Sequence, residues 1–132
     1  MWLPSKSPSI QIHSNPELCF EEYKAHDACV ALLQKLGFTA KAHAYDISTS
    51  FEAEYGSGGR VVVFNAEYDA LPGIGHACGH NLIATASFAA FIATAEQLKV
   101  SGLPGRVRLL PRGWLLGTLP RRFRRLQVHR QP

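Results

Sequence analysis

Residues 61–82, with the sequence VVVFNAEYDALPGIGHACGHNL, change from an apolar run to a glycine-rich loop and then to the start of an apolar helix. The first four residues are β-branched or aromatic, which is the pattern of a strand buried on both faces. We therefore predict that this strand lies at the centre of a sheet. The polar residues that follow it would then stand at the carboxyl end of the sheet, where α/β proteins place their sites.

The flanking segments predict the other elements. Asn15 can cap a helix, Pro16 suits its first position, and apolar residues then recur at helical spacing. Alternating stretches and an alanine-rich run complete the pattern. The expected elements are a helix over about residues 16–36, strands over 39–45, 50–55 and 106–110, and a helix over 82–98. This order predicts an α/β fold with a mainly parallel sheet.

Size and composition narrow the class of protein. A chain of 132 residues suits one domain. Hydrophobic residues make up 46% of the chain and charged residues 18%, and this composition excludes an intrinsically disordered protein. No apolar run approaches the ~20 residues that cross a membrane, so we expect no membrane partner. The chain has three cysteines, an odd number that does not suit a secreted fold held by disulfides. The first ten residues lack the apolar segment of a signal peptide. We expect a cytoplasmic protein.

Charge divides the chain unevenly. All ten acidic residues lie within residues 1–96, whereas residues 97–132 hold nine of the 14 basic residues. Residues 111–132 contain six arginines and three prolines but no lysine. We expect residues 1–110 to form the domain and residues 111–132 to be a divergent, disordered tail. The tail has two interpretations: an alternative exon or shifted reading frame, and an arm that binds nucleic acid.

The loop sequence His76-Ala77-Cys78-Gly79-His80 is a candidate metal site. Thiolate and imidazole are versatile transition-metal ligands, and the neighbouring glycines allow a tight turn. On spacing alone, metal binding and an ordinary loop remain equal alternatives. The other histidines have no partner at ligand spacing, and we expect surface or capping roles for them: His13, His26, His43 and His129.

Two motifs, NPELCFEE at residues 15–22 and AEYDALPGIGHACGHN at residues 66–81, carry a family resemblance. They resemble the aminoacylase and carboxypeptidase-like metallopeptidase and amidohydrolase family. The branch concerned contains aminobenzoyl-glutamate, indole-acetyl-amino-acid and N-acyl-amino-acid hydrolases and a β-alanyl dipeptide hydrolase. The resemblance covers about residues 11–110. It implies the N-terminal part of a three-layer α/β catalytic domain, truncated before the dimerisation domain through which the intact family often forms dimers.

The resemblance also implies site residues. Cys78 and His80 match metal ligands, for zinc or manganese, and Asp69 matches the catalytic-site acid that orients them. Glu67 stands where related branches carry a ligand histidine, and we do not assign it as a ligand. His76 is expected to support the loop. The implied substrates are small N-acyl amino acids or dipeptide-like molecules.

The general base of the family is the first residue of a Glu-Glu pair that follows the strand matching residues 106–110. Here a different sequence begins at Pro111, and no acidic residue follows Glu96. We therefore expect a catalytically incomplete fragment of a metal-dependent amidohydrolase or dipeptidase. The alternatives are a non-catalytic truncated isoform that acts as a binding module, and an Arg-rich nucleic-acid-binding protein.

Overall fold

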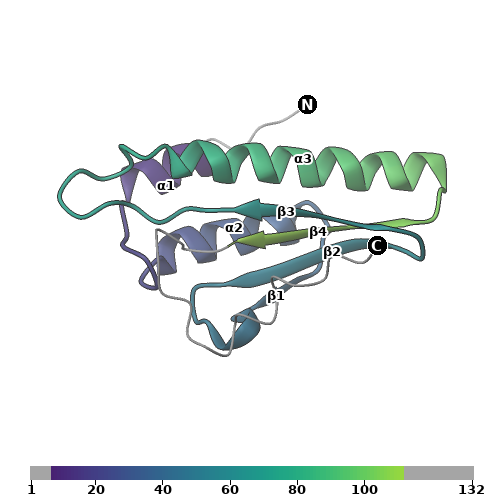
Figure 1. Ribbon diagram of the computed structural model, residues 1–132, viewed down its shortest axis with the longest axis horizontal. Helices are drawn as coiled ribbons and strands as arrows, with labels where there is room; N and C mark the ends of the chain where they lie inside the picture. Colours follow the sequence, from purple (N-terminus) through teal and green to yellow (C-terminus); the bar gives the residue numbers. More distant parts are fainter. Residues whose placement is uncertain (1–6, 112–132) are drawn as a thin grey trace, which may run out of the picture.

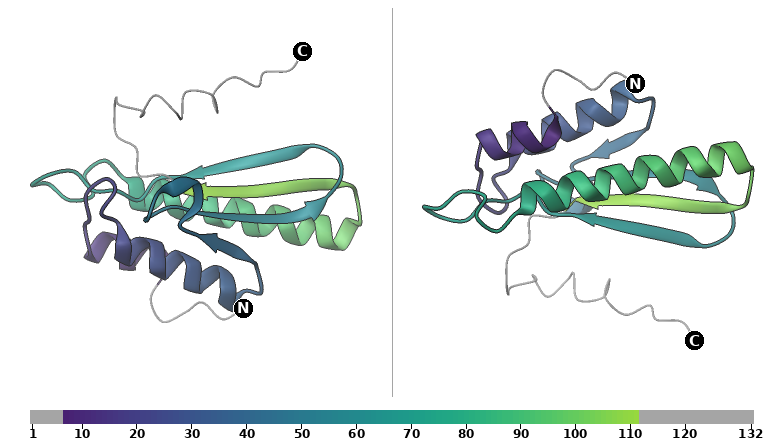
Figure 2. Two further views of the ribbon diagram at one scale, coloured as in Figure 1. Left: turned by 90° about the horizontal axis from the view of Figure 1, so that it is seen from below. Right: turned by 90° about the horizontal axis from the view of Figure 1, so that it is seen from above.

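The computed structural model describes residues 7–111, and its strands form one sheet in the order β1-β2-β4-β3 (Figure 1). The elements are α1 (Pro8–Ser14), α2 (Tyr23–Lys35), β1 (Ala40–Ala42), the 3-10 turn η1 (Ala44–Asp46), β2 (Phe51–Ser57), β3 (Val61–Ala66), α3 (His80–Ser101) and β4 (Gly105–Pro111). The helices lie on one side of the sheet (Figure 2). The expected tail, apart from Pro111, lies outside the described residues.

The sheet is mixed. β1 pairs with β2 and β2 with β4 in antiparallel fashion, whereas β3 and β4 run parallel. The α/β class is confirmed, but the expectation of a mainly parallel sheet is wrong for residues 7–111. The glycine turn after β2 reverses the chain into β3, and only the crossover through α3 returns β4 parallel to β3. These residues form two layers, without the third layer that the resemblance implies.

The valine run does not lie at the centre of the sheet. β3 is an edge strand in the part of the chain that the structure describes, and Val61, Val62 and Val63 are 38%, 49% and 49% exposed. β4 occupies the inner position instead, with Val107 and Leu109 fully buried. A β-branched run predicts a strand correctly, but it does not determine the strand's place, because pairing depends on distant segments.

One face of α3 forms much of the core. Its side chains Ala84, Phe88, Phe91 and Ala95 are buried at helical spacing. The Phe91 ring lies 5.1 Å from that of Phe38, and the Phe88 ring 6.0 Å from that of Phe51. Edge-to-face contacts of this kind hold the helix on the sheet. Among the described helices, none is long and apolar enough to cross a membrane.

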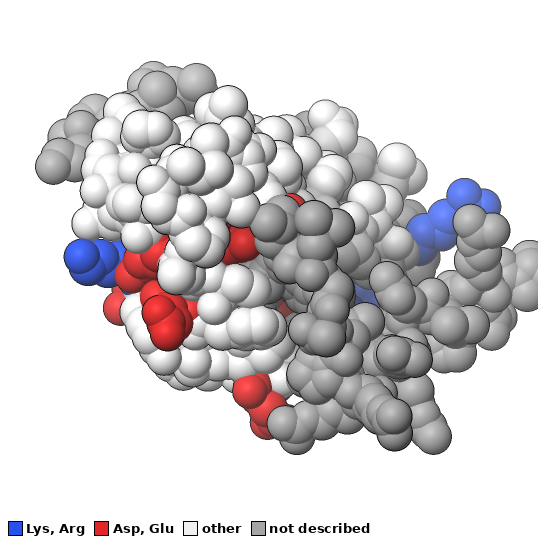
Figure 3. Space-filling view, turned by 60° about the vertical axis from the view of Figure 1, so that its left-hand side comes forward, with Lys and Arg blue, Asp and Glu red and all other residues white. Residues whose placement is uncertain are grey.

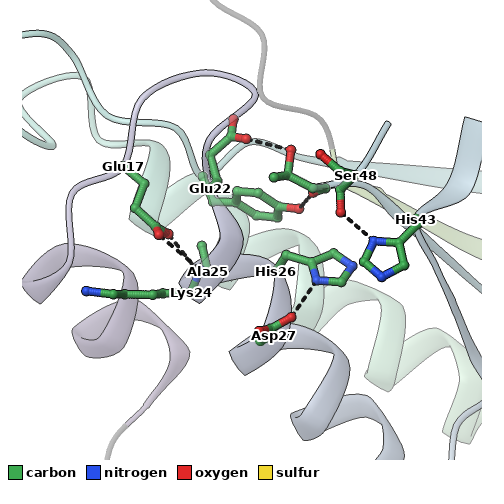
Figure 4. Close-up of polar contacts among 10 residues, drawn as sticks. Glu17, Glu22, Lys24, Ala25, His26, Asp27, His43 and Ser48 are labelled. Atoms are coloured by element: carbon green, nitrogen blue, oxygen red, sulfur yellow. Dashed lines mark hydrogen bonds and ion pairs between the residues drawn. The ribbon is translucent and has the colours of Figure 1, made fainter. Parts of the chain in front are cut away.

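The helix expected over residues 16–36 is shorter than predicted. α2 begins only at Tyr23, and Glu17 lies outside it. The two carboxylate oxygens of Glu17 accept hydrogen bonds from the backbone N–H groups of Lys24 and Ala25, each at 3.0 Å (Figure 4). Glu17 therefore caps α2 from a distance, and the charge is favourable at a helix N-terminus. Residues 15–22 form a loop that contacts the segment after β3, where Ala70 N–H donates to the Glu17 carbonyl at 2.7 Å.

Two glycines test how closely β2 approaches β4. Both Gly56 and Gly37 have positive φ, but a Cβ on Gly56 would lie 2.2 Å from the Gly105 carbonyl oxygen, whereas one on Gly37 meets nothing within 4 Å. We expect Gly37→Ala to lower the free energy of unfolding by about 1 kcal/mol through backbone strain alone. Gly56→Ala should lower it by clearly more, because the strands must separate. Urea unfolding followed by circular dichroism measures both, and equal losses would contradict the close approach.

Candidate metal centre

The loop between β3 and α3, residues 67–79, projects beyond the carboxyl end of β3 (Figure 1). It is closed by a turn in which Leu71 N–H donates to the Gly75 carbonyl at 2.9 Å. A β-bridge between Leu18 and Ala70 attaches it to the loop of residues 15–22. The two motifs that carry the family resemblance are therefore joined in space.

Asp69 and His80 are in direct contact at the base of this loop. Oδ1 of Asp69 lies 2.8 Å from Nδ1 of His80, and both side chains are buried. Nδ1 also lies 3.1 Å from the Asp69 carbonyl oxygen, so two acceptors assign the N–H to Nδ1. Nε2 then presents a lone pair. Metal-binding histidines are commonly held by a carboxylate in this way.

Glu67 lies on the other side of the same ring. Its Oε2 is 3.2 Å from Nε2 of His80, and its side chain is 26% exposed. A lone pair and a carboxylate oxygen at this distance require a proton or a cation between them. The sequence pattern did not assign Glu67 to the site. The signal that identifies it is its spacing of two residues from Asp69, which places two carboxylates around one imidazole.

Cys78 lies near this pair without closing a metal site. Its partly buried Sγ is 3.9 Å from the Asp69 carbonyl oxygen. Within residues 7–111, no group of three or more His, Cys, Asp and Glu side chains is arranged to hold a metal ion. The thiol of Cys78 and the Nε2 of His80 are donors that suit a divalent transition metal. The described residues therefore fit part of a metal site.

The other four histidines of residues 7–111 form two stacked pairs, and His129 lies outside the described residues. The His76 ring lies 6.1 Å from that of His13, both of its nitrogens are buried without a hydrogen-bond partner, and burial lowers its pKa. His26 is only 2% exposed, so the expected surface role is wrong for this residue. Its ring stacks on His43 at 4.9 Å, and His43 Nδ1 lies 2.5 Å from the Ser48 carbonyl oxygen (Figure 4). His13 and His43 are exposed, which agrees with the surface position expected for them.

A buried cluster of polar side chains lies next to the site. Glu22 is fully buried, its Oε2 accepts a hydrogen bond from the Thr49 hydroxyl at 2.7 Å, and its Oε1 has no partner (Figure 4). The Tyr68 hydroxyl donates to the Thr49 carbonyl. Burial raises the pKa of Glu22, and the negative charge of Asp69 raises it further. The cluster joins the loop of residues 15–22 to Tyr68, the neighbour of Asp69.

Among the side chains that Figure 3 colours, several acidic ones gather on the face seen there. This view brings forward the end that carries the loop of residues 67–79. A concentration of negative charge raises the local concentration of cations.

Comparison with known proteins identifies relatives of this chain. No family model matches it. It is 36% identical over 115 residues to one of the subunits of p-aminobenzoyl-glutamate hydrolase from Escherichia coli K12, covering 74% of this chain and 24% of the relative. It is 35% identical over 113 residues to the Xaa-Arg dipeptidase of Mus musculus, covering 77% of this chain and 26% of the relative. The chain thus spans about a quarter of the length of these curated relatives.

Solved structures agree with these relatives. A proposed aminohydrolase from methicillin-resistant Staphylococcus aureus superposes with a TM-score of 0.64 at 20% identity, covering 76% of this chain and 30% of that chain. A dinuclear metal-binding peptidase of the M20 family from Bacillus subtilis superposes with a TM-score of 0.59 at 27% identity, covering 75% of this chain and 31% of that chain. By their names, the relatives and the Bacillus subtilis neighbour are hydrolases that act on amide and peptide bonds. These relatives match the family that the two motifs resemble, and the Bacillus subtilis neighbour is described as a peptidase of the M20 family.

The raised pKa of Glu22 predicts a pH dependence. An ordinary unfolded glutamate titrates near ~4.3. Because the folded state keeps the proton to higher pH, the free energy of unfolding should fall as pH rises from that value toward the raised folded pKa. Glu22→Gln should remove this slope, whereas Glu21→Gln, at an exposed position, should retain it. Urea unfolding between about pH 4 and pH 8 measures the difference, and identical slopes for Glu22→Gln and the unmodified chain would contradict the argument.

Proposed function

We propose that this chain carries one part of the metal centre of a hydrolase that cleaves an amide bond to an amino acid with a free carboxylate. The observation that carries the proposal is the buried His80 imidazole, which Asp69 holds at Nδ1 and whose Nε2 faces the Glu67 carboxylate. The Cys78 thiol lies 3.9 Å from the Asp69 carbonyl oxygen. The names of the relatives support the substrate class. Both p-aminobenzoyl-glutamate and an Xaa-Arg dipeptide contain an acyl group joined through an amide to an amino acid.

Cys78 and His80 are the proposed metal ligands, and zinc or manganese is the proposed metal, supported by the donor chemistry and by the dinuclear relative. A bound divalent cation would activate water and polarise the substrate carbonyl. Asp69 is a positioning residue, because its carboxylate holds the His80 ring and its tautomer. The proposal assigns the remaining ligands and the general base to the part of the relatives that this chain does not match.

We also infer a cytoplasmic, reducing environment. None of the three cysteines forms a disulfide in the structure, and a ligand role for Cys78 requires its thiol to stay reduced.

Zinc titration tests the ligands. Two donors are fewer than the roughly four of a closed zinc site, so binding should be micromolar or weaker. Cys78→Ser should weaken it by about tenfold or more, whereas Cys19→Ser, at another partly exposed thiol, should leave it unchanged. Calorimetry measures the affinity. Stoichiometric zinc retained through dialysis against a chelator would show that further ligands are present.

Amide hydrolysis tests the function. The 132-residue chain should not release arginine from Xaa-Arg dipeptides with zinc or manganese, since loss of a general base costs about 10² to 10⁴ in rate. A chimera in which residues 11–110 replace the matched segment of the mouse dipeptidase should be active. Cys78→Ala or His80→Ala in the chimera should abolish activity, whereas Cys19→Ser should not.

Two results would contradict the proposal. Turnover by the 132-residue chain itself, lost in Cys78→Ala, would show that the chain is catalytically complete. A folded chimera whose activity survives Cys78→Ala and His80→Ala would show that these residues are not ligands.

A further inference from the structure

Two carboxylates flank the His80 ring, one at each of its nitrogen atoms. Oδ1 of Asp69 lies 2.8 Å from Nδ1, whereas Oε2 of Glu67 lies 3.2 Å from Nε2. Because Nδ1 carries the proton that Asp69 accepts, the lone pair of the ring is on Nε2. Glu67 therefore faces the one atom of this ring that can bind a cation.

The segment after β3 holds the Glu67 side chain in this position. Tyr68 is fully buried in the core, while the side chains before and after it, Glu67 and Asp69, both reach His80. The side-chain amide of Asn65, in β3, lies 3.5 Å from Oε1 of Glu67. This contact at Oε1 leaves Oε2 as the oxygen that faces the ring.

The distance between the two facing atoms suits a cation better than a proton. A charge-assisted N–H···O hydrogen bond measures about 2.7–2.9 Å. Two donor atoms at about 2.0–2.2 Å from one ion, at an angle of about 90–110°, are about 2.8–3.6 Å apart. The 3.2 Å between Oε2 of Glu67 and Nε2 of His80 lies near the middle of the second range and outside the first.

We propose that Glu67 is a metal ligand, and that one divalent transition-metal cation lies between its Oε2 and Nε2 of His80. This inference rests on the proposed function and adds a donor from this chain to it. Within residues 7–111, no three His, Cys, Asp and Glu side chains surround one point, so the pair supplies part of a coordination sphere. The Glu67 side chain is 26% exposed and that of His80 only 5%, so the cation reaches the pair from the side of Glu67.

The carboxylate affects which metal the pair prefers. Glu67 supplies a negative charge and an oxygen donor, and carboxylate oxygens suit manganese, whereas the thiolate of Cys78 suits zinc. Asp69 is paired with Nδ1 on the other side of the ring, so it does not replace Glu67 at the cation. Loss of the Glu67 carboxylate should therefore weaken manganese binding at least as much as zinc binding.

Zinc and manganese titrations of the full 132-residue chain test the proposal. Glu67→Gln keeps the shape of the side chain and should raise the zinc dissociation constant about tenfold or more. Glu67→Asp keeps the charge but withdraws the oxygen by one methylene group, so a ligand role predicts weaker binding here too. Glu96→Gln, at a 56% exposed carboxylate near the other end of α3, is the matched control and should bind both metals as the unmodified chain does.

Calorimetry measures the affinities, and circular dichroism shows that each variant is folded. If Glu67→Gln fails to fold, Glu67→Asp carries the test, because it retains the buried partner's counter-charge. Equal affinities for zinc in the unmodified chain and in the folded Glu67 variants, with weaker binding in Cys78→Ser, would overturn this inference and leave the proposed function standing. An affinity that falls in Glu67→Gln but is retained in Glu67→Asp would also overturn it, because charge alone would then explain the loss. No zinc binding by the unmodified chain at about 1 mM would overturn both.

Discussion

The hydrogen bond between Asp69 and His80 joins the end of β3 to the first residue of α3, and the site depends on it. Asp69 is 1% exposed, and a buried carboxylate is tolerated only when it is paired. The same bond closes the intervening loop at its base and sets the orientation of the imidazole. One contact therefore satisfies a buried charge, ends the loop and presents Nε2.

The contacts that surround this bond are also buried and polar. Glu22 and Tyr68 both form hydrogen bonds with Thr49. Glu17 caps α2 through its carboxylate, and its backbone carbonyl accepts a hydrogen bond from Ala70 N–H. These contacts explain why the motif at residues 15–22 accompanies the motif at residues 66–81, although more than forty residues separate them. The first motif holds the loop that carries the proposed ligands.

The sheet differs from this site, because the outer edge of β3 has no paired strand within residues 7–111. The helices bury one face through alternate residues of β2 and β4, while the other face keeps charged pairs such as Arg108 with Glu54. Val61, Val62 and Val63 of β3 are partly exposed. The chain thus combines a well-packed helical layer with an edge strand, β3, that has the uncharged and largely apolar sequence of an inner strand.

The sequence by itself determined the elements whose signals are local. Periodicity and turn residues predicted the strands at β3 and β4 and the helix α3, and the glycine-rich motif brought Asp69, Cys78 and His80 to attention. Only the tertiary structure decided that β4, and not β3, takes the inner position in the sheet. It also decided that Glu17 caps α2 from a distance and that Glu67 faces His80. The physical reason is that strand order and side-chain partners depend on contacts between distant residues, and such contacts leave no periodic pattern in the sequence.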